Sequence, residues 1–237
     1  MNLAITITKK EIKSYFSSPS AYIVLVIFLL LSGWFFASPL FINNQANLRT
    51  LFGIIPLLYL FFVPAITMGL ISREKNNGTM ELLATLPIKN SQIIMGKFWA
   101  SVILIGVGLL LTLIHFITIM VLGTNVDFGA IFCGYIGLLF LGAVYSSIGI
   151  FASSITSNQI VSLIISFFII FFFFVIKFFL FFVPDFMVGI FQFISIDYHF
   201  SNIARGVIDT RNIIYFVSLI LLFLKLAQIS LENRNWK

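Results

Sequence analysis

Hydrophobic residues fall into six long runs along the chain, separated by short segments that carry most of the charges. A helix crosses the hydrocarbon core of a bilayer with about 20 mostly apolar residues, and the runs have that length. Strands of a membrane barrel would instead show short segments of alternating polarity. The pattern therefore predicts an all-α integral membrane protein with spans at Ala21–Leu40, Phe52–Ile71, Ile93–Leu122, Phe128–Phe151, Ile160–Phe182 and Ile213–Leu231.

The composition excludes a water-soluble globule. Of the 237 residues, 60% are hydrophobic and 9% are charged, whereas soluble domains carry about 25% charged residues. The net charge of +6 does not indicate nucleic-acid binding, because the basic residues are scattered between apolar runs and do not gather on one polar face. We expect residues 1–237 to form a single transmembrane domain, and the first span to stay in place instead of being cleaved as a signal peptide.

The basic residues predict the orientation, because cytoplasmic loops carry an excess of Lys and Arg. If both termini are cytoplasmic, the residues at or near the inner side are Lys9, Lys10, Lys13, Arg73, Lys75, Lys89, Lys97, Lys225, Arg234 and Lys237. Only Arg49, Arg205 and Arg211 then fall outside, and Lys177 lies within the fifth span. This asymmetry favours cytoplasmic termini.

The first non-spanning segment, residues 1–18, predicts an interfacial helix. Its apolar and basic residues occupy different faces at helical spacing, as in helices that lie in the membrane surface. The apolar face holds Ile5, Ile12, Tyr15 and Phe16, and the basic face holds Lys9, Lys10 and Lys13. A merely solvated basic tail is the alternative.

The second segment, residues 73–90, predicts a turn followed by a short amphipathic helix. Asn76-Asn77-Gly78 is a turn signal, Thr79 is expected to cap the helix, and Glu81 suits the positive end of its dipole. Apolar residues then recur at helical spacing until Pro87 discourages continuation; they are Met80, Leu83 and Leu86. An isolated helix this short is unstable in water. It therefore needs a surface to pack on. The candidates are the bilayer, the rest of the chain and another protein.

The third segment, residues 183–211, is rich in aromatic residues and interrupted by Pro184, Gly189 and Gly206. We expect short outer helices that dip into the outer leaflet or cap the bundle. Lys177 lies near the outer end of the span before it. Snorkelling to the headgroups is the simplest interpretation, and the alternatives are a pathway lining or a pair with an acid such as Asp185.

Small residues four positions apart in the fourth span predict close helix packing, more within the chain than between copies of it. They are Ala130/Gly134, Cys133/Gly137 and Gly142/Ser146.

The motifs of an enzyme are missing from the sequence. Gly96-Lys97 is followed by Phe98 and lacks the earlier glycine of a phosphate-binding loop, so the chain is not expected to hydrolyse ATP. His115 and His199 lie far apart in the sequence without a set of metal ligands around either, and no nucleophile, base and acid combine into a hydrolase site. An ion-coupled carrier is disfavoured, because Lys177 and His115 are the only Lys, Arg, His, Asp or Glu residues of the spans that are not assigned to the inner side.

Two segments resemble the inner loops of ABC-2-type transporter permeases. Residues 71–88 combine a basic-acidic-basic cluster, a Gly-Thr turn and a Glu-Leu-Leu helix, and residues 148–159 resemble the second inner turn of that family. Residues 196–200 and 204–211 are similar to a gliding-motility-associated branch from Bacteroidota. The resemblance covers essentially the whole chain. It implies a six-helix ABC-2 transmembrane domain, like that of type V exporters, with an N-terminal interfacial helix and outer re-entrant helices before the last span.

The resemblance also implies partners and site residues. The chain would be a multi-pass subunit of the bacterial inner membrane, paired with a second permease or a copy of itself and resting on two ATPase subunits that bind ATP and Mg. An auxiliary membrane protein with a large periplasmic domain is implied by the gliding branch. A non-transporting scaffold or assembly factor for a motility or secretion machine is the alternative function.

In this family the first inner-loop helix docks on the ATPase. The matching residues are Arg73, Glu74, Lys75, Gly78, Thr79, Glu81, Leu82, Leu83 and Leu86, with a smaller second contact at Thr156, Asn158 and Gln159. The second turn has no charge here, which departs from the family pattern. In the outer segment the residues carried over are Asp197, His199, Arg205 and Asp209.

Overall fold

The computed structural model describes residues 3–43, 48–80, 88–122, 127–179, 184–207 and 209–233, and every regular element within these ranges is a helix. Six helical spans, each long and apolar enough to cross a membrane, occur in this described part of the chain, which confirms the prediction. They are α2 (Pro19–Asn43), α3 (Arg49–Thr67) with α4 (Gly69–Asn76), α6 (Asn90–Leu111) with α7 (Leu113–Leu122), α8 (Phe128–Ile155), α9 (Gln159–Phe179) and α12 (Thr210–Glu232).

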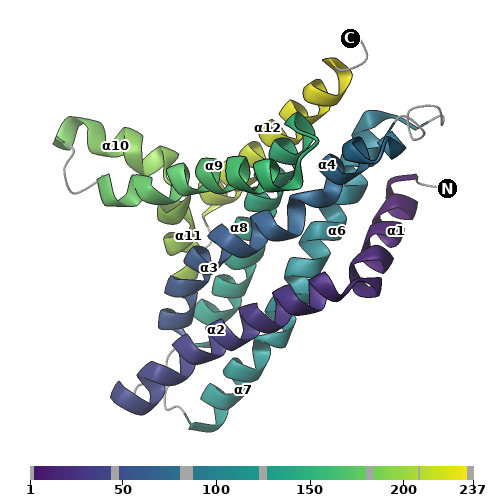
Figure 1. Cartoon of the computed structure of the whole chain (residues 1–237). Helices are drawn as coiled ribbons and strands as arrows, with labels where there is room; N and C mark the ends of the chain where they lie inside the picture. Colours follow the sequence, from purple (N-terminus) through teal and green to yellow (C-terminus); the bar gives the residue numbers. More distant parts are fainter. Residues whose placement is uncertain are drawn as a thin grey trace.

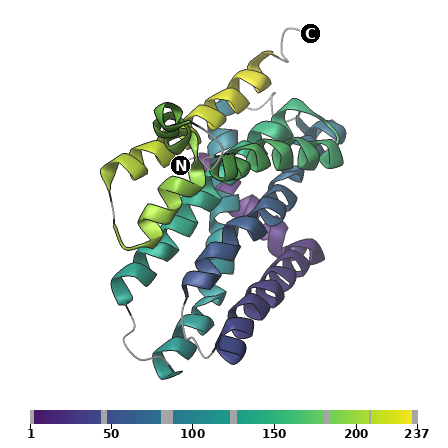
Figure 2. The same ribbon diagram turned by 90° about the vertical axis from the view of Figure 1, so that its left-hand side faces the viewer.

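Three shorter helices complete the described structure: α1 (Leu3–Ser17), α10 (Asp185–Ile194) and α11 (Ile196–Ala204). Helix α1 and the C-terminal ends of α4 and α12 lie toward one end of the bundle, which we call the terminal face (Figure 1). The ends of α2 and α7 lie toward the other end, the opposite face, and Figure 2 shows the same separation from a second side.

The fourth span, α8, is the centre of the bundle and contacts α3, α4, α6, α9, α11 and α12. Its small residues allow these neighbours to approach closely. A methyl group on Gly134 would overlap the ring of Phe52, and one on Gly149 would overlap the hydroxyl of Thr67. The small residues at this spacing therefore serve packing within the chain, as the sequence predicted.

The second span is interrupted at Met68, between α3 and α4. Ser153 of α8 satisfies the polar groups at this break, because its Oγ accepts from the backbone N–H of Ile71 at 3.0 Å and of Ser72 at 2.9 Å. The same hydroxyl donates to the Met68 carbonyl at 2.9 Å. Since the first N–H groups of a helix have no partner within it, this contact fixes where α4 begins and holds it against α8.

Candidate functional site

A buried lysine lies at the centre of a charged cluster at the terminal face. The side chain of Lys97, on α6, is 1% exposed, and its Nζ lies 2.9 Å from Glu74 Oε1 of α4 and 3.1 Å from Glu11 Oε1 of α1. Nζ also donates to the Leu70 carbonyl at 2.6 Å. A buried ammonium is tolerated only with counter-charges and hydrogen bonds. The ion pairs therefore tie three helices together, and we call Lys97, Glu11, Glu74 and Lys10 the terminal network.

Lys10 is the exposed member of the terminal network. Its side chain is 62% exposed, and its Nζ lies 3.4 Å from Glu74 Oε1 and 3.6 Å from Glu11 Oε1. With two lysines facing two carboxylates, the formal charges of the network balance. Lys75, one residue after Glu74, donates from Nζ to the Ser154 carbonyl at the end of α8. Glu74 is thus bonded to α1 and α6, and the next residue, Lys75, is bonded to α8.

Helix α1 is also held against the bundle by hydrogen bonds outside the terminal network. Thr8 Oγ1 lies 3.0 Å from the Gly96 carbonyl of α6, and Tyr15 donates to the Ile66 carbonyl of α3 at 3.0 Å. Burial, with a smaller effect of the Glu11 carboxylate, raises the pKa of Tyr15, so its hydroxyl remains a donor. A methyl group on Gly96 would lie 2.7 Å from Ile7, which shows how closely α1 and α6 approach.

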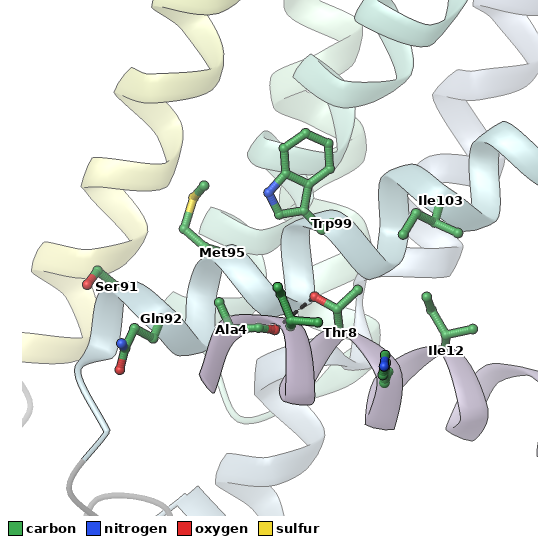
Figure 3. Close-up of a pocket in the computed structure, with 10 residues that line it drawn as sticks. Ala4, Thr8, Ile12, Ser91, Gln92, Met95, Trp99 and Ile103 are labelled. Atoms are coloured by element: carbon green, nitrogen blue, oxygen red, sulfur yellow. Dashed lines mark hydrogen bonds between the residues drawn. The ribbon is translucent and has the colours of Figure 1, made fainter. Parts of the chain in front are cut away.

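A groove of about 700 Å³ runs between α1 and α6 beside the terminal network. Figure 3 shows its lining, with Trp99, Met95 and Ile103 on α6 and Ala4, Thr8 and Ile12 on α1. Most of these side chains are apolar, and Trp99 is half exposed. An apolar groove of this kind suits the lipid-facing edge of an interfacial helix.

The first predicted docking residues lie around the end of α4. Arg73 is exposed, Glu74 belongs to the terminal network, and α4 ends at Asn76. Gly78 has φ +69°, the left-handed conformation that favours glycine, and Thr79 Oγ1 lies 3.2 Å from the Glu74 carbonyl. The predicted turn at residues 76–78 is therefore present. Glu81, Leu82, Leu83 and Leu86 lie outside the described residues.

The residues on either side of 81–87 connect to α4 and α6. Met80 is buried in a cluster with Leu70, Ile71, Ile94 and Phe98. After the segment, α6 begins at Asn90, and the Lys89 N–H donates to Gln92 Oε1 at 3.2 Å. A force applied between these flanks therefore acts on α4 and α6.

The residues predicted for the second contact lie in the turn between α8 and α9. Thr156 Oγ1 accepts from the Asn158 N–H at 3.1 Å, and Asn158 Oδ1 accepts from the Ile160 N–H at 2.9 Å. Asn158 thus caps α9. Gln159 lies beside Gly69 at the start of α4, where a Cβ atom would be 3.3 Å from Gln159 Oε1. The structure therefore brings the two predicted contacts near each other through α4.

At the opposite face, Lys177 pairs with Asp197 at 3.2 Å, and not with Asp185 as one alternative suggested. The Nζ atom also lies 4.1 Å from the centroid of the Phe174 ring. Asp197 belongs to α11, whose packing brings it back over the end of α9. Arg205 follows α11 and is exposed.

Two other outer residues hold the local structure. His199 is buried, stacks on Tyr215 with ring centroids 3.9 Å apart, and forms hydrogen bonds through Nδ1 to Asn212 at 2.7 Å and Nε2 to the Phe193 carbonyl at 3.1 Å. Asp209 caps α12 by accepting from the Arg211 N–H at 2.8 Å. Their contacts position α11 and α12.

The terminal network was not predicted from the sequence. Lys97 was assigned only to the inner side, although a lysine inside an apolar run was a signal that it needs an acid. In the described part of the chain no group of three or more His, Cys, Asp or Glu side chains is placed to hold a metal ion.

The comparisons with known proteins agree with the architecture. A family model described as "ABC-2 family transporter protein" matches residues 5–234, nearly the whole chain. No curated protein matches the sequence.

Proposed function

Because the chain belongs to the ABC-2 family of transporter proteins, we propose that it is the transmembrane subunit of an ATP-driven transporter, with ATP hydrolysed on separate subunits. The family match and the six apolar helices make it a multi-pass membrane protein. The absence of a phosphate-binding loop from the sequence agrees with ATP hydrolysis on separate subunits.

Residues 73–90 are the proposed contact with the ATPase. The observation that carries this proposal is the buried Lys97, which joins α4 and α1 to α6 directly beside that segment. A push on the segment would act on three helices at once instead of bending a loop. Nucleotide-driven closure of the ATPases would then shift the bundle between conformations.

The proposed orientation places the terminal face in the cytoplasm. The order of spans and loops in the sequence puts ten basic residues near that side and three near the other. This asymmetry supports the orientation under the positive-inside rule. The same orientation gives the ATPases access to residues 73–90 and to the turn between α8 and α9.

The proposed assembly contains two ATPase subunits with ATP and Mg, and a second permease or another copy of this chain. The sequence similarity of residues 196–200 and 204–211 to the gliding-motility branch supports a role in surface motility or secretion, with an auxiliary protein that has a large periplasmic domain.

Substitution of Glu81 tests the coupling role. Glu81→Arg reverses the charge at the start of the proposed docking helix, so we expect the ATPase to co-purify poorly or to hydrolyse ATP without regulation by the membrane subunit. Asp185→Arg makes the same charge reversal on an exposed residue at the start of α10 and serves as the control. The readouts are recovery of the complex from native membranes in mild detergent and its ATPase rate.

Leu83→Asp is a second, independent disruption of the same helix. If both variants keep normal complex recovery and ATPase activity, the coupling role is wrong. If no ATPase accompanies the protein from native membranes, the result favours the non-transporting scaffold.

A further inference from the structure

The groove between α1 and α6, which we call the α1–α6 groove, has the length of one lipid molecule. Its lining extends along α6 from Ser91 to Ile103, a distance of about 18 Å at the rise of an α-helix. A bilayer is about 40–45 Å thick with its headgroups, so one leaflet measures about 20 Å. The volume of the groove, about 700 Å³, lies in the usual range of ligand sites.

The α1–α6 groove also lies at the depth of one leaflet. Helices α6 and α7 together form a span of 33 residues, which is about 50 Å long. This length is close to the full thickness of the bilayer, so the first turn of α6 lies at the level of the headgroups. Ser91 and Gln92 line the groove in that turn, and Met95, Trp99 and Ile103 line it further along α6. The lining thus changes from polar to apolar with depth, as a lipid does.

The apolar side chains of the α1–α6 groove can be reached from outside the protein (Figure 3). Met95, Trp99 and Ile103 are 37%, 49% and 41% exposed, and Ile5 on α1 is 54% exposed. Within the described residues the indole N–H of Trp99 has no hydrogen-bond partner, so it is able to donate to a lipid oxygen. A lipid chain can therefore contact this wall without displacing any part of the bundle.

Two lysines at the edge of the α1–α6 groove have no acid partner. Lys9 lines the groove, and Lys13 lies four residues later on the same side of α1. Both are exposed, and neither forms an ion pair within the part of the chain that the structure describes. The neighbouring terminal network is balanced, so it does not neutralise them. The edge of the groove therefore carries two positive charges that an anionic headgroup would complement.

We propose that the α1–α6 groove binds one acidic phospholipid, with its headgroup beside Lys9 and Lys13 and a chain against Trp99 and Ile103. The flexible stems of the lysines let their ammonium groups reach the level of the headgroups, and basic side chains there attract anionic lipids. The proposal depends on the membrane location of the chain and not on its coupling to an ATPase. Its failure would therefore leave the proposed function untouched.

The test uses the full-length protein, purified in a neutral detergent and stripped of lipid. Dioleoyl phosphatidylglycerol is titrated, and the unfolding temperature is followed, because a ligand that binds the folded state raises it. Dioleoyl phosphatidylcholine has the same chains without net charge, and glycerol phosphate offers the anion without chains. We expect saturable stabilisation by phosphatidylglycerol alone in the concentration range tested.

Charge-removing variants locate the headgroup. Lys9→Gln and Lys13→Gln should each weaken the apparent affinity for phosphatidylglycerol about fivefold, because each removes one cation from the edge of the groove. Lys225→Gln removes the same charge from an exposed residue of α12 that does not line the groove, and should leave the affinity within about twofold.

A second pair of variants locates the lipid chain. Trp99→Ala removes the largest apolar side chain of the groove wall and should weaken the apparent affinity about tenfold. Trp34→Ala removes the same side chain from α2, where it is 70% exposed and does not line the groove, so the affinity should stay within about twofold.

Four outcomes would overturn the proposal. Equal weakening by Lys225→Gln would mean general attraction to a basic surface, and equal weakening by Trp34→Ala would mean that the chain does not lie in the groove. Equal stabilisation by phosphatidylcholine would remove the need for an acidic headgroup. Full stabilisation by glycerol phosphate would assign the two lysines to a free anion instead of a lipid.

Discussion

The two faces of the bundle place their charges in contrasting ways. At the terminal face, Lys97 is buried between Glu11 and Glu74, and the charges balance. At the opposite face, Lys177 pairs with Asp197 beside a cavity, and both side chains are partly exposed. A charge removed from water needs a partner to be tolerated, so the terminal network holds helices together. The pair of Lys177 and Asp197 stays partly exposed to its surroundings, so each charge depends less on the other.

The largest effect expected from this contrast is on Lys97. Lys97→Met leaves two carboxylates without their buried counter-charge and should lower the free energy of unfolding by about 3–5 kcal/mol, measured by thermal unfolding in one detergent. Lys10→Met, at the exposed edge of the same network, should cost about 0–1 kcal/mol. Replacing Glu11 and Glu74 by Gln together with Lys97→Met should restore part of the loss. Equal losses of stability in Lys97→Met and Lys10→Met would contradict a structural role for the burial of Lys97.

The next effect concerns the close approach of α8 to the break in the second span. Gly149→Ala places a methyl group against Thr67, and overpacking of this kind should cost about 1–3 kcal/mol. Gly189→Ala is the control, because nothing lies within 4 Å of its added Cβ. Thermal unfolding of the two variants measures the difference. A cost at Gly149 no larger than at Gly189 would show that the break is loosely packed.

A similar loss, of about 1–2 kcal/mol, is expected for Ser153→Ala, because two buried N–H groups lose their acceptor. Hydrogen exchange provides a direct measurement, since the amides of Ile71 and Ser72 should exchange faster than in the wild type. Ser157→Ala, at an exposed position of the next turn, is the matched control. Unchanged protection of both amides would disprove the capping role.

The smallest effect is expected at the opposite face. Lys177→Gln breaks the ion pair with Asp197, but both side chains are partly exposed, so the stability loss should be less than about 1 kcal/mol. Thermal unfolding without added lipid measures it. A loss as large as that of Lys97→Met would mean that the ion pairs of the two faces contribute equally to stability.

Local sequence features were sufficient to predict the helices. Hydropathy located the six spans, and the Asn76-Asn77-Gly78 signal located the end of α4, because both depend on neighbouring residues. The sequence also predicted packing within the chain around α8. The docking residues Glu81 to Leu86 lie outside the described residues, so their role stays a prediction.

Contacts between distant parts of the chain could not be predicted in the same way. Lys97 meets an acid 86 positions away, and that meeting depends on α1 folding back along α6. Snorkelling was the simplest interpretation of Lys177, with a pair to an acid such as Asp185 as one alternative, but the turn between α10 and α11 brings Asp197 to it. Arg49, Lys177 and Arg205 meet only after three helices have packed.

The length of α8 has a mechanical consequence. This helix has 28 residues, so it is a rod of about 42 Å at the rise of an α-helix. Ser153 and Ser154 bond α4 near one end of the rod, while α11 packs on it nearer the other. A tilt of about 5° about one end would sweep the far end through about 4 Å. If a movement of α4 tilted α8 by this small angle, the far end of α8 would move by about the diameter of a methyl group.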